Sequence, residues 1–194
     1  MNTAKLLRFI LLLTTGISGA FATETSSGPL RLAVVGLTHG HSARFVTNAL
    51  ARLDVKFVGI VEADEGLVAR AMERHQLPRG FFHDRLDSLL ANGKLDAVAA
   101  FNMTFEHLAV VEACAPRGVH VMVEKPLAVS LEHARAIERA ATNGGIHVIV
   151  NYEPVWSPAD QRAFELVREK NAVGEIRKLV AHDGNNGPVG KYRR

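Results

Sequence analysis

The chain has 194 residues and a nearly balanced charge, with 23 Lys and Arg against 20 Asp and Glu, a formal net charge of +3. It contains no long basic run, which argues against nucleic acid as a partner. Cys114 is the only cysteine, which excludes a disulfide within the chain and a metal cage of several thiolates. Because Cys114 lies in an Ala/Val-rich stretch, we expect a buried apolar thiol there.

The N-terminus has the pattern of a secretory signal peptide over residues 1–22. Lys5 and Arg8 precede the apolar run Phe9–Leu13, and a small-residue tract ends in Ala20-Phe21-Ala22. The apolar run is well short of the roughly 20 residues that a membrane-spanning helix needs, although retention as an anchor is the alternative to cleavage. The absence of an adjacent arginine pair favours a Sec-type route. We therefore predict an exported protein, periplasmic or secreted, with no stable membrane span after cleavage.

A short polar linker over residues 23–29 is followed by apolar runs that alternate with helical patterns. Strands are predicted at Leu30–Val35, Val55–Val61, Phe81–Phe82, Asp96–Phe101, Val119–Val123 and Ile146–Val150. Helices are predicted at Ser42–Leu53, Glu65–His75, Leu86–Leu90, Phe105–Ala115 and from a Ser130 cap to Thr142. This alternation predicts an α/β fold over residues 30–152, a doubly wound parallel sheet of the Rossmann type.

The pattern changes after Asn151, where Pro154 and Pro158 interrupt it. A helix is predicted at Ala159–Lys170 and a strand at Val173–His182, before a tail rich in Gly, Asn and Pro. One helix and one strand are too little to bury a core of their own. Residues 153–194 are therefore predicted either to dock onto the first domain or to begin an incomplete second α+β domain.

The first strand–helix turn is the first candidate ligand site, because parallel sheets bind ligands beyond the carboxyl ends of their strands. A dinucleotide-binding loop reads G-x-G-x-x-G, so that its backbone can approach the pyrophosphate at the helix N-terminus. Here Thr38 and His41 stand where the second and third glycines would be. Taken alone, the turn fits a cofactor loop or a simple tight turn equally well. Its residues are Gly36, Leu37, Thr38, His39, Gly40 and His41.

Glu62 ends the second predicted strand, 26 positions after Gly36. An acidic residue at about this place accepts the ribose hydroxyls of NAD, and its charge repels the 2′-phosphate of NADP. The sequence therefore favours NAD over NADP. The alternatives are that Glu62 is only a solvated charge at a strand end, or that Asp64 takes the role.

His39 and His41 invite the question of a metal. Two imidazoles in one loop, without a carboxylate nearby in the sequence, are too few ligands for a site. We therefore predict no metal centre, and we expect the two histidines to contact phosphate or substrate.

The most specific segment contains Asn102 and His107, and then a strand that closes with Glu124-Lys125-Pro126. In these motifs the chain resembles the glucose–fructose oxidoreductase/inositol dehydrogenase (Gfo/Idh/MocA) family. The resemblance runs from about Leu30 to His182. It implies an oxidoreductase that passes hydride between a nicotinamide cofactor and a sugar or polyol.

The resemblance also implies roles for particular residues. Lys125 would lie beside the nicotinamide and the substrate and polarise a hydroxyl or carbonyl, and Glu124 would orient the cofactor. Pro126 would fix the backbone so that Lys125 points inward, through a cis bond. Asn102 would touch the cofactor. His107 would either contact the substrate or be a packed helix histidine.

Asn151, with Tyr152 next to it, matches a segment that lines the cofactor crevice in the family. Family members continue into a large antiparallel sheet domain that supplies substrate contacts and an acid/base histidine. Because the sequence ends at Arg194, we expect that domain to be incomplete and a homo-oligomer only if the full sheet exists. The alternatives to the oxidoreductase are a non-catalytic nucleotide- or sugar-binding module and an inactive truncated fragment.

Overall fold

The computed structural model describes residues 28–92, 94–152, 157–180 and 182. The predicted signal peptide and most of the predicted linker lie outside the described residues. Among the helices that are described, none combines the length and the apolar character needed to cross a bilayer.

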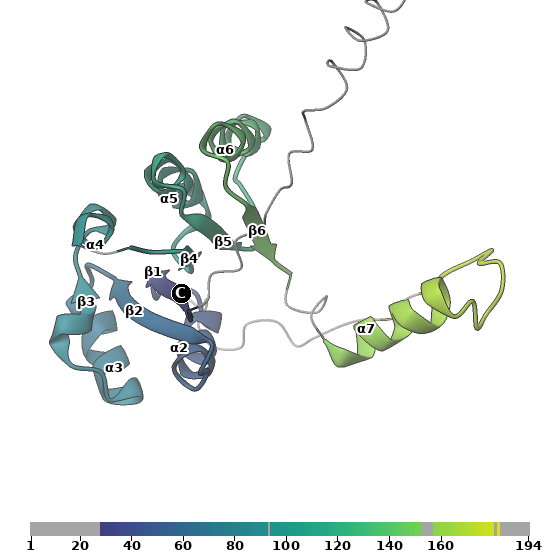
Figure 1. The fold of residues 1–194 in the computed structure, drawn as a ribbon, viewed down its shortest axis with the longest axis horizontal. Helices are drawn as coiled ribbons and strands as arrows, with labels where there is room; N and C mark the ends of the chain where they lie inside the picture. The colour runs from purple at the N-terminus through teal and green to yellow at the C-terminus, as the bar shows by residue number, and fades with distance from the viewer. Residues whose placement is uncertain (1–27, 93, 153–156, 181, 183–194) are drawn as a thin grey trace, which may run out of the picture.

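The described chain is organised around one six-stranded sheet in which every pairing is parallel. Its strand order is β3-β2-β1-β4-β5-β6, so the direction of winding switches between β1 and β4 (Figure 1). This is the strand order of the doubly wound dinucleotide-binding fold, and it confirms the predicted fold class. The strands are β1 (Leu30–Val35), β2 (Val55–Val61), β3 (Phe82–His83), β4 (Ala97–Ala100), β5 (His120–Glu124) and β6 (Val148–Asn151).

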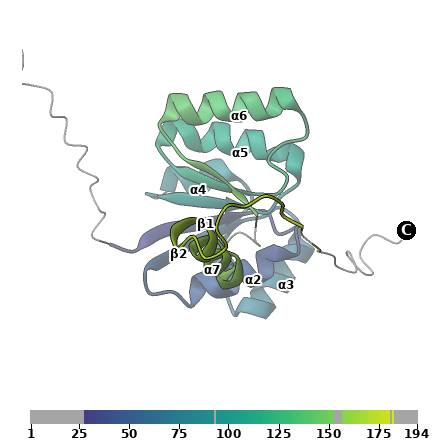
Figure 2. The ribbon, with the colours of Figure 1, turned by 90° about the vertical axis from the view of Figure 1, so that its right-hand side faces the viewer.

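Helices cover both faces of this sheet, with α2 and α3 on one face and α5 and α6 on the other (Figure 2). The longer helices are α2 (His41–Leu50), α3 (Glu65–His75), α4 (Leu86–Asn92), α5 (His107–Cys114) and α6 (Leu131–Gly144). Three short turns of 3₁₀ helix join them, namely η1 (Arg79–Phe81), η2 (Thr104–Glu106) and η3 (Ala115–Arg117). This arrangement explains why the strands read as continuous apolar runs: both faces of each central strand are buried.

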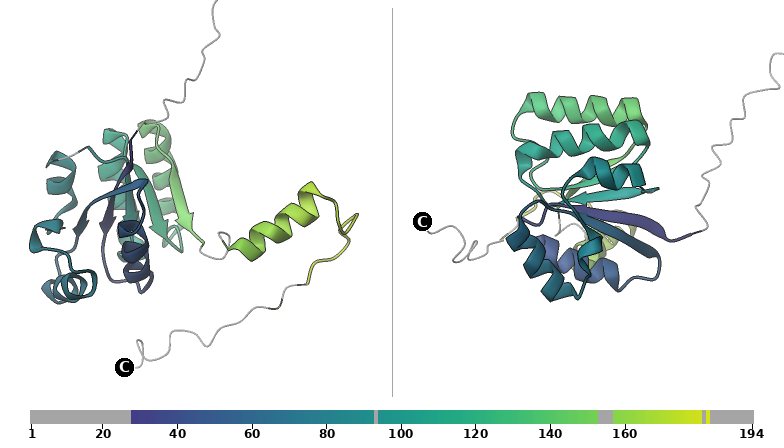
Figure 3. Two further views of the ribbon diagram at one scale, coloured as in Figure 1. Left: turned by 60° about the horizontal axis from the view of Figure 1, so that its bottom comes forward. Right: turned by 90° about the vertical axis from the view of Figure 1, so that its left-hand side faces the viewer.

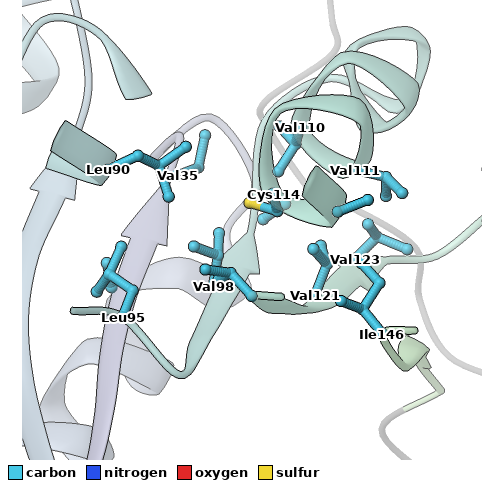
Figure 4. Close-up of a cluster of buried hydrophobic side chains, with 14 of the residues drawn as sticks. Val35, Leu90, Leu95, Val98, Val110, Val111, Cys114, Val121, Val123 and Ile146 are labelled. Carbon is cyan, nitrogen blue, oxygen red and sulfur yellow. The ribbon is translucent and has the colours of Figure 1, made fainter. Parts of the chain in front are cut away.

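The core is divided by the sheet into two apolar clusters. In β1, Ala33 and Val35 face the cluster under α5 and α6, whereas Leu32 and Val34 face the cluster under α2 and α3. Figure 4 shows part of the first cluster, where side chains of β1, β4 and β5 meet those of α4 and α5. The alternation along one strand makes β1 the central wall between the two clusters.

Most predicted boundaries agree with the structure to within a few residues. The expected Ser130 cap forms, since its hydroxyl oxygen accepts the His133 N–H at 3.2 Å. The first helix ends at Leu50 rather than Leu53, and Leu53 is almost fully exposed. The third strand is Phe82–His83 instead of Phe81–Phe82, because Phe81 closes the turn η1.

Residues 157–180 contain helix but no strand. The predicted helix is confirmed as α7 (Pro158–Phe164), continued by the π-helical segment η5 (Glu165–Glu169) (Figure 3). The Ser157 hydroxyl oxygen caps it by accepting the Asp160 N–H. The predicted strand at Val173–His182 is wrong for its described residues, which form turns and irregular chain. A strand forms by pairing, and no neighbouring strand pairs with this segment among the described residues. Its apolar residues Val173, Ile176, Leu179 and Val180 are exposed.

Cys114 is fully buried in the first cluster, as the sequence indicated, and burial raises the pKa of its thiol to about 12. Because thiolate is the reactive form, we expect Ellman's reagent at pH 8 to leave the native thiol almost unmodified. The unfolded chain in guanidinium should react with one equivalent. The measurement is the absorbance of the released thiolate under both conditions. Rapid reaction of the native protein would contradict the buried placement.

Candidate nucleotide-binding site

The turn after β1 is built around Gly36. Its φ of +78° lies in the left-handed region, and a Cβ placed there would approach the Cβ of Asn102 to 2.5 Å. Only glycine avoids both the strain and the overlap. The loop after β1 and the loop after β4 are therefore in direct contact at the switch in strand order, where doubly wound folds bind their ligands.

Backbone hydrogen bonds fasten this turn to the sheet. The His39 N–H donates to the Phe101 carbonyl at 3.0 Å, and the Ser42 N–H donates to the His39 carbonyl at 3.1 Å. Helix α2 follows with Gly40 at its N-cap, and His39 Nδ1 accepts the His41 backbone N–H at 3.3 Å at this helix end. The partial positive charge of that helix end is thus presented to the turn, which suits an anionic group.

Glu62, at the carboxyl end of β2, is tied to the same turn. Its Oε2 accepts the Leu37 N–H at 2.8 Å, and its Oε1 accepts the Asp64 N–H at 2.9 Å. Asp64, the competing residue, instead caps α3 through the Leu67 N–H at 2.9 Å. The structure therefore gives the two acids different tasks, and Glu62 is the one held beside the turn.

A hollow of about 480 Å³ lies between this turn and α3. Arg70, Arg74 and His75 bring basic side chains to it from α3, and Thr38 and His39 line it from the turn. The two arginines could not be identified from the sequence, because helix α3 contains no motif that marks them. Their position next to the N-terminus of α2 makes this hollow suited to anionic groups such as phosphates.

The carboxyl end of β5 brings Glu124 against the turn. Its side chain is only 2% exposed, and its Oε2 accepts the Asn151 Nδ2–H at 2.8 Å. The Nδ1 atoms of His41 and His39 lie 3.3 and 3.9 Å from the same oxygen. Each of these four residues was predicted at the crevice separately, but nothing in their spacing along the chain indicates that three of them meet at the Glu124 carboxylate.

Lys125 follows Glu124 and is exposed at the end of β5. The Lys125–Pro126 peptide bond is cis, as the resemblance implied. Asn102 contacts Gly36, and its Oδ1 is buried without a hydrogen-bond partner among the described residues. Tyr152, at the end of β6, is exposed.

His107 is buried at the start of α5, with 1% of its surface exposed. Its Nδ1 lies 3.1 Å from the Leu127 carbonyl oxygen, which can only accept, so the Nδ1–H donates a hydrogen bond to that oxygen. Its Nε2 is also buried and has no hydrogen-bond partner in the described part of the chain. The contact fixes the segment that follows Lys125, which fits a packed, positioning histidine. A direct substrate contact stays a prediction.

The site therefore combines the parts of a dinucleotide-binding crevice: a glycine turn, a helix N-terminus, an acid at the end of β2 and a Glu-Lys pair at the end of β5. A sequence model of the oxidoreductase family with an NAD-binding Rossmann fold, Gfo/Idh/MocA, matches residues 30–152. The chain belongs to this family.

Curated relatives and solved structures agree with that membership. The chain is 28% identical over 130 residues to D-xylose 1-dehydrogenase (NADP(+)) 2 of Haloferax volcanii, a match that covers 67% of the chain and 39% of that protein. It is 32% identical over 108 residues to myo-inositol dehydrogenase Hyg17 of Streptomyces leeuwenhoekii, covering 55% and 33%. The chain thus spans well under half the length of these relatives.

Among solved structures, the fold is similar to that of an oxidoreductase from Agrobacterium radiobacter in complex with NAD+, L-tartaric acid and magnesium. The TM-score is 0.67 at 23% identity, and the match covers 75% of this chain and 42% of the other.

Proposed function

We propose that this chain is the nucleotide-binding part of an NAD(P)-dependent oxidoreductase that acts on a sugar or polyol. The observation that carries the proposal is the convergence of Gly36, Glu62 and Glu124-Lys125 at the carboxyl ends of β1, β2 and β5. Family membership and relatives named for xylose and inositol support the substrate class. Two side chains, Thr38 and His41, occupy positions where the loop motif has glycine, so the pyrophosphate would meet side chains there as well as backbone.

Lys125 is the residue we propose to act on the substrate. When bound, the nicotinamide supplies the hydride acceptor. An ammonium group at the end of β5 can donate a hydrogen bond to the hydroxyl oxygen of the carbon that is oxidised, which lowers the pKa of that hydroxyl and assists transfer of its proton to water. His107, through the Leu127 carbonyl, would keep the Lys125–Leu127 segment in place.

Isothermal titration of the full chain with NAD+, NADH, NADP+ and NADPH tests the proposal directly. We expect one nucleotide to bind per chain. A folded sample, shown to be so by circular dichroism, that bound none of the four would overturn both the oxidoreductase proposal and the idea of a nucleotide-binding module.

We further propose that NAD is preferred over NADP, because the Glu62 carboxylate lies beside the turn and would repel a 2′-phosphate. Glu62→Gln keeps an oxygen acceptor but removes the charge. We expect the dissociation constant for NADP, divided by that for NAD, to fall by about tenfold, the equivalent of roughly 1.4 kcal/mol. The ratio is measured by the same titrations.

Asp64→Asn is the matched control, since asparagine also caps helices and the Asp64 side chain caps α3. Its ratio of dissociation constants should equal that of the wild type. If Asp64→Asn changed the ratio and Glu62→Gln did not, the assignment of the two acids would be reversed.

A further inference from the structure

His39, His41 and Glu124 together form a set of side chains that can bind a metal ion. Two imidazoles from the turn after β1 and one carboxylate from the end of β5 come together although His41 and Glu124 are 83 positions apart in the chain. Each offers one ligand atom, and the three atoms lie within 4.8 Å of one another. Two histidines and a carboxylate form a donor set used by catalytic zinc and by other divalent transition metals.

The distances suit a shared ion. Donor atoms that each lie about 2.1 Å from one ion are roughly 3.4 Å apart in tetrahedral geometry and at most about 4.2 Å apart. The Nδ1 atoms of His41 and His39 lie 3.3 and 3.9 Å from Glu124 Oε2. The two rings pack edge to face with their centroids 4.5 Å apart. His39 Nδ1 also accepts the His41 backbone N–H at 3.3 Å, a hydrogen bond that an ion bound to this nitrogen would replace. The three donor atoms lie within 4.8 Å of one another, and side-chain rotation would bring them onto one ion.

The burial of Glu124 is a second, independent observation. Its side chain is 2% exposed, and its Oε1 has no hydrogen-bond partner among the described residues. A buried carboxylate needs a compensating positive charge and partners for its lone pairs. The neighbouring Oε2 is held by the Asn151 amide at 2.8 Å, the kind of outer hydrogen bond that orients a metal-binding carboxylate.

We propose that His39, His41 and Glu124 bind one divalent transition-metal ion of the zinc and cobalt class, with the remaining coordination positions open to water or an anionic oxygen. The sequence offered no third ligand, and for that reason no metal was expected there. The fold supplies one from β5. The proposal goes beyond nucleotide binding, and its test needs no nucleotide.

Cobalt(II) titration of the full, chelator-treated chain in the absence of nucleotide tests it. We expect one Co²⁺ per chain, a visible absorption band typical of low coordination number, and displacement by Zn²⁺. His39→Ala, His41→Ala and Glu124→Gln should each abolish the band. Asn151→Ala should weaken binding by about 10- to 100-fold, as loss of an outer hydrogen bond does at other metal sites.

The second histidine pair of the chain provides the matched control. His120 and His147 stack with ring centroids 5.2 Å apart. They lie at the amino ends of β5 and β6, away from Glu124 at the carboxyl end of β5, and no carboxylate joins them among the described residues. His120→Ala should leave the cobalt band and its affinity unchanged. Thermal melts of every variant separate loss of the site from loss of the fold.

Two outcomes would overturn the proposal: no cobalt binding by folded wild-type protein, or a cobalt band that survives in any of the three ligand variants. Because no nucleotide is present, this failure is separate from a failure to bind NAD(P), which the calorimetric titrations report on their own.

Discussion

Gly36→Ala should be among the most damaging single substitutions in the chain. The new Cβ would lie 2.5 Å from Asn102 Cβ and 2.6 Å from its Cα and N, and the backbone would stay at a φ of +78° that alanine disfavours. We expect the free energy of unfolding to fall by about 3 kcal/mol or more, and the melting temperature by roughly 10 °C. Nucleotide binding should be lost as well, because the turn has to move away from the loop after β4.

Substitutions at two other glycines separate the effect of backbone strain from the effect of the overlap with Asn102. Gly118 has a φ of +68° but open space around it, so Gly118→Ala tests strain alone and should cost only about 1 kcal/mol. Gly80 has neither positive φ nor a neighbour within 4 Å, and Gly80→Ala should be nearly neutral. Equal destabilisation by Gly36→Ala and Gly118→Ala would show that the contact with Asn102 adds nothing.

Lys125→Met should remove turnover while leaving the nucleotide in place. Methionine keeps the length and the apolar stem of the side chain but carries no ammonium, so the substrate hydroxyl loses its hydrogen-bond donor. With a panel of sugars and polyols as substrates and NADH formation as the readout, we expect kcat to fall by about 10²- to 10⁴-fold. The dissociation constant for NAD should change by less than about threefold, since the group acts on the reacting carbon.

Lys94→Met is the control for this experiment, because Lys94 is an exposed lysine just before β4, at the other end of the sheet. Its kcat should equal that of the wild type. An unchanged kcat in Lys125→Met would show that Lys125 takes no part in the reaction. Loss of nucleotide affinity would show instead that Lys125 binds the cofactor.

The fold was predictable because its causes are local or periodic. Leu30–Val35 and Val55–Val61 are continuous apolar runs of strand length, and both became strands at the expected residues. The Ser130 cap was likewise visible, since a cap depends on residues three apart. The strand expected at Val173–His182 failed because apolar content alone does not provide a neighbour to pair with.

Single residues of the site could be predicted from the sequence, but most of the contacts between them could not. Gly36 and Glu62 were identified from a motif and a spacing, and the hydrogen bond between Glu62 and the Leu37 N–H joins these two parts. The convergence of His39 and His41 on Glu124 depends on β1 and β5 flanking β4, which no spacing along the chain encodes. His107 shows the same limit, because its bond to the Leu127 carbonyl links a helix start to a loop 20 positions away.

The two edge strands of the sheet, β3 and β6, differ in length. β3 has two residues, so it presents little backbone for another strand to join, whereas β6 has four and carries the exposed Ile149, with the exposed Tyr152 directly after it. Growth of the sheet by a further strand, from any source, is therefore directed to the β6 border. A newcomer there would lie about 4.8 Å from the backbone of Asn151, and so next to the amide that holds Glu124. A strand that pairs with β6 would therefore act on the position of the Glu124 carboxylate through Asn151.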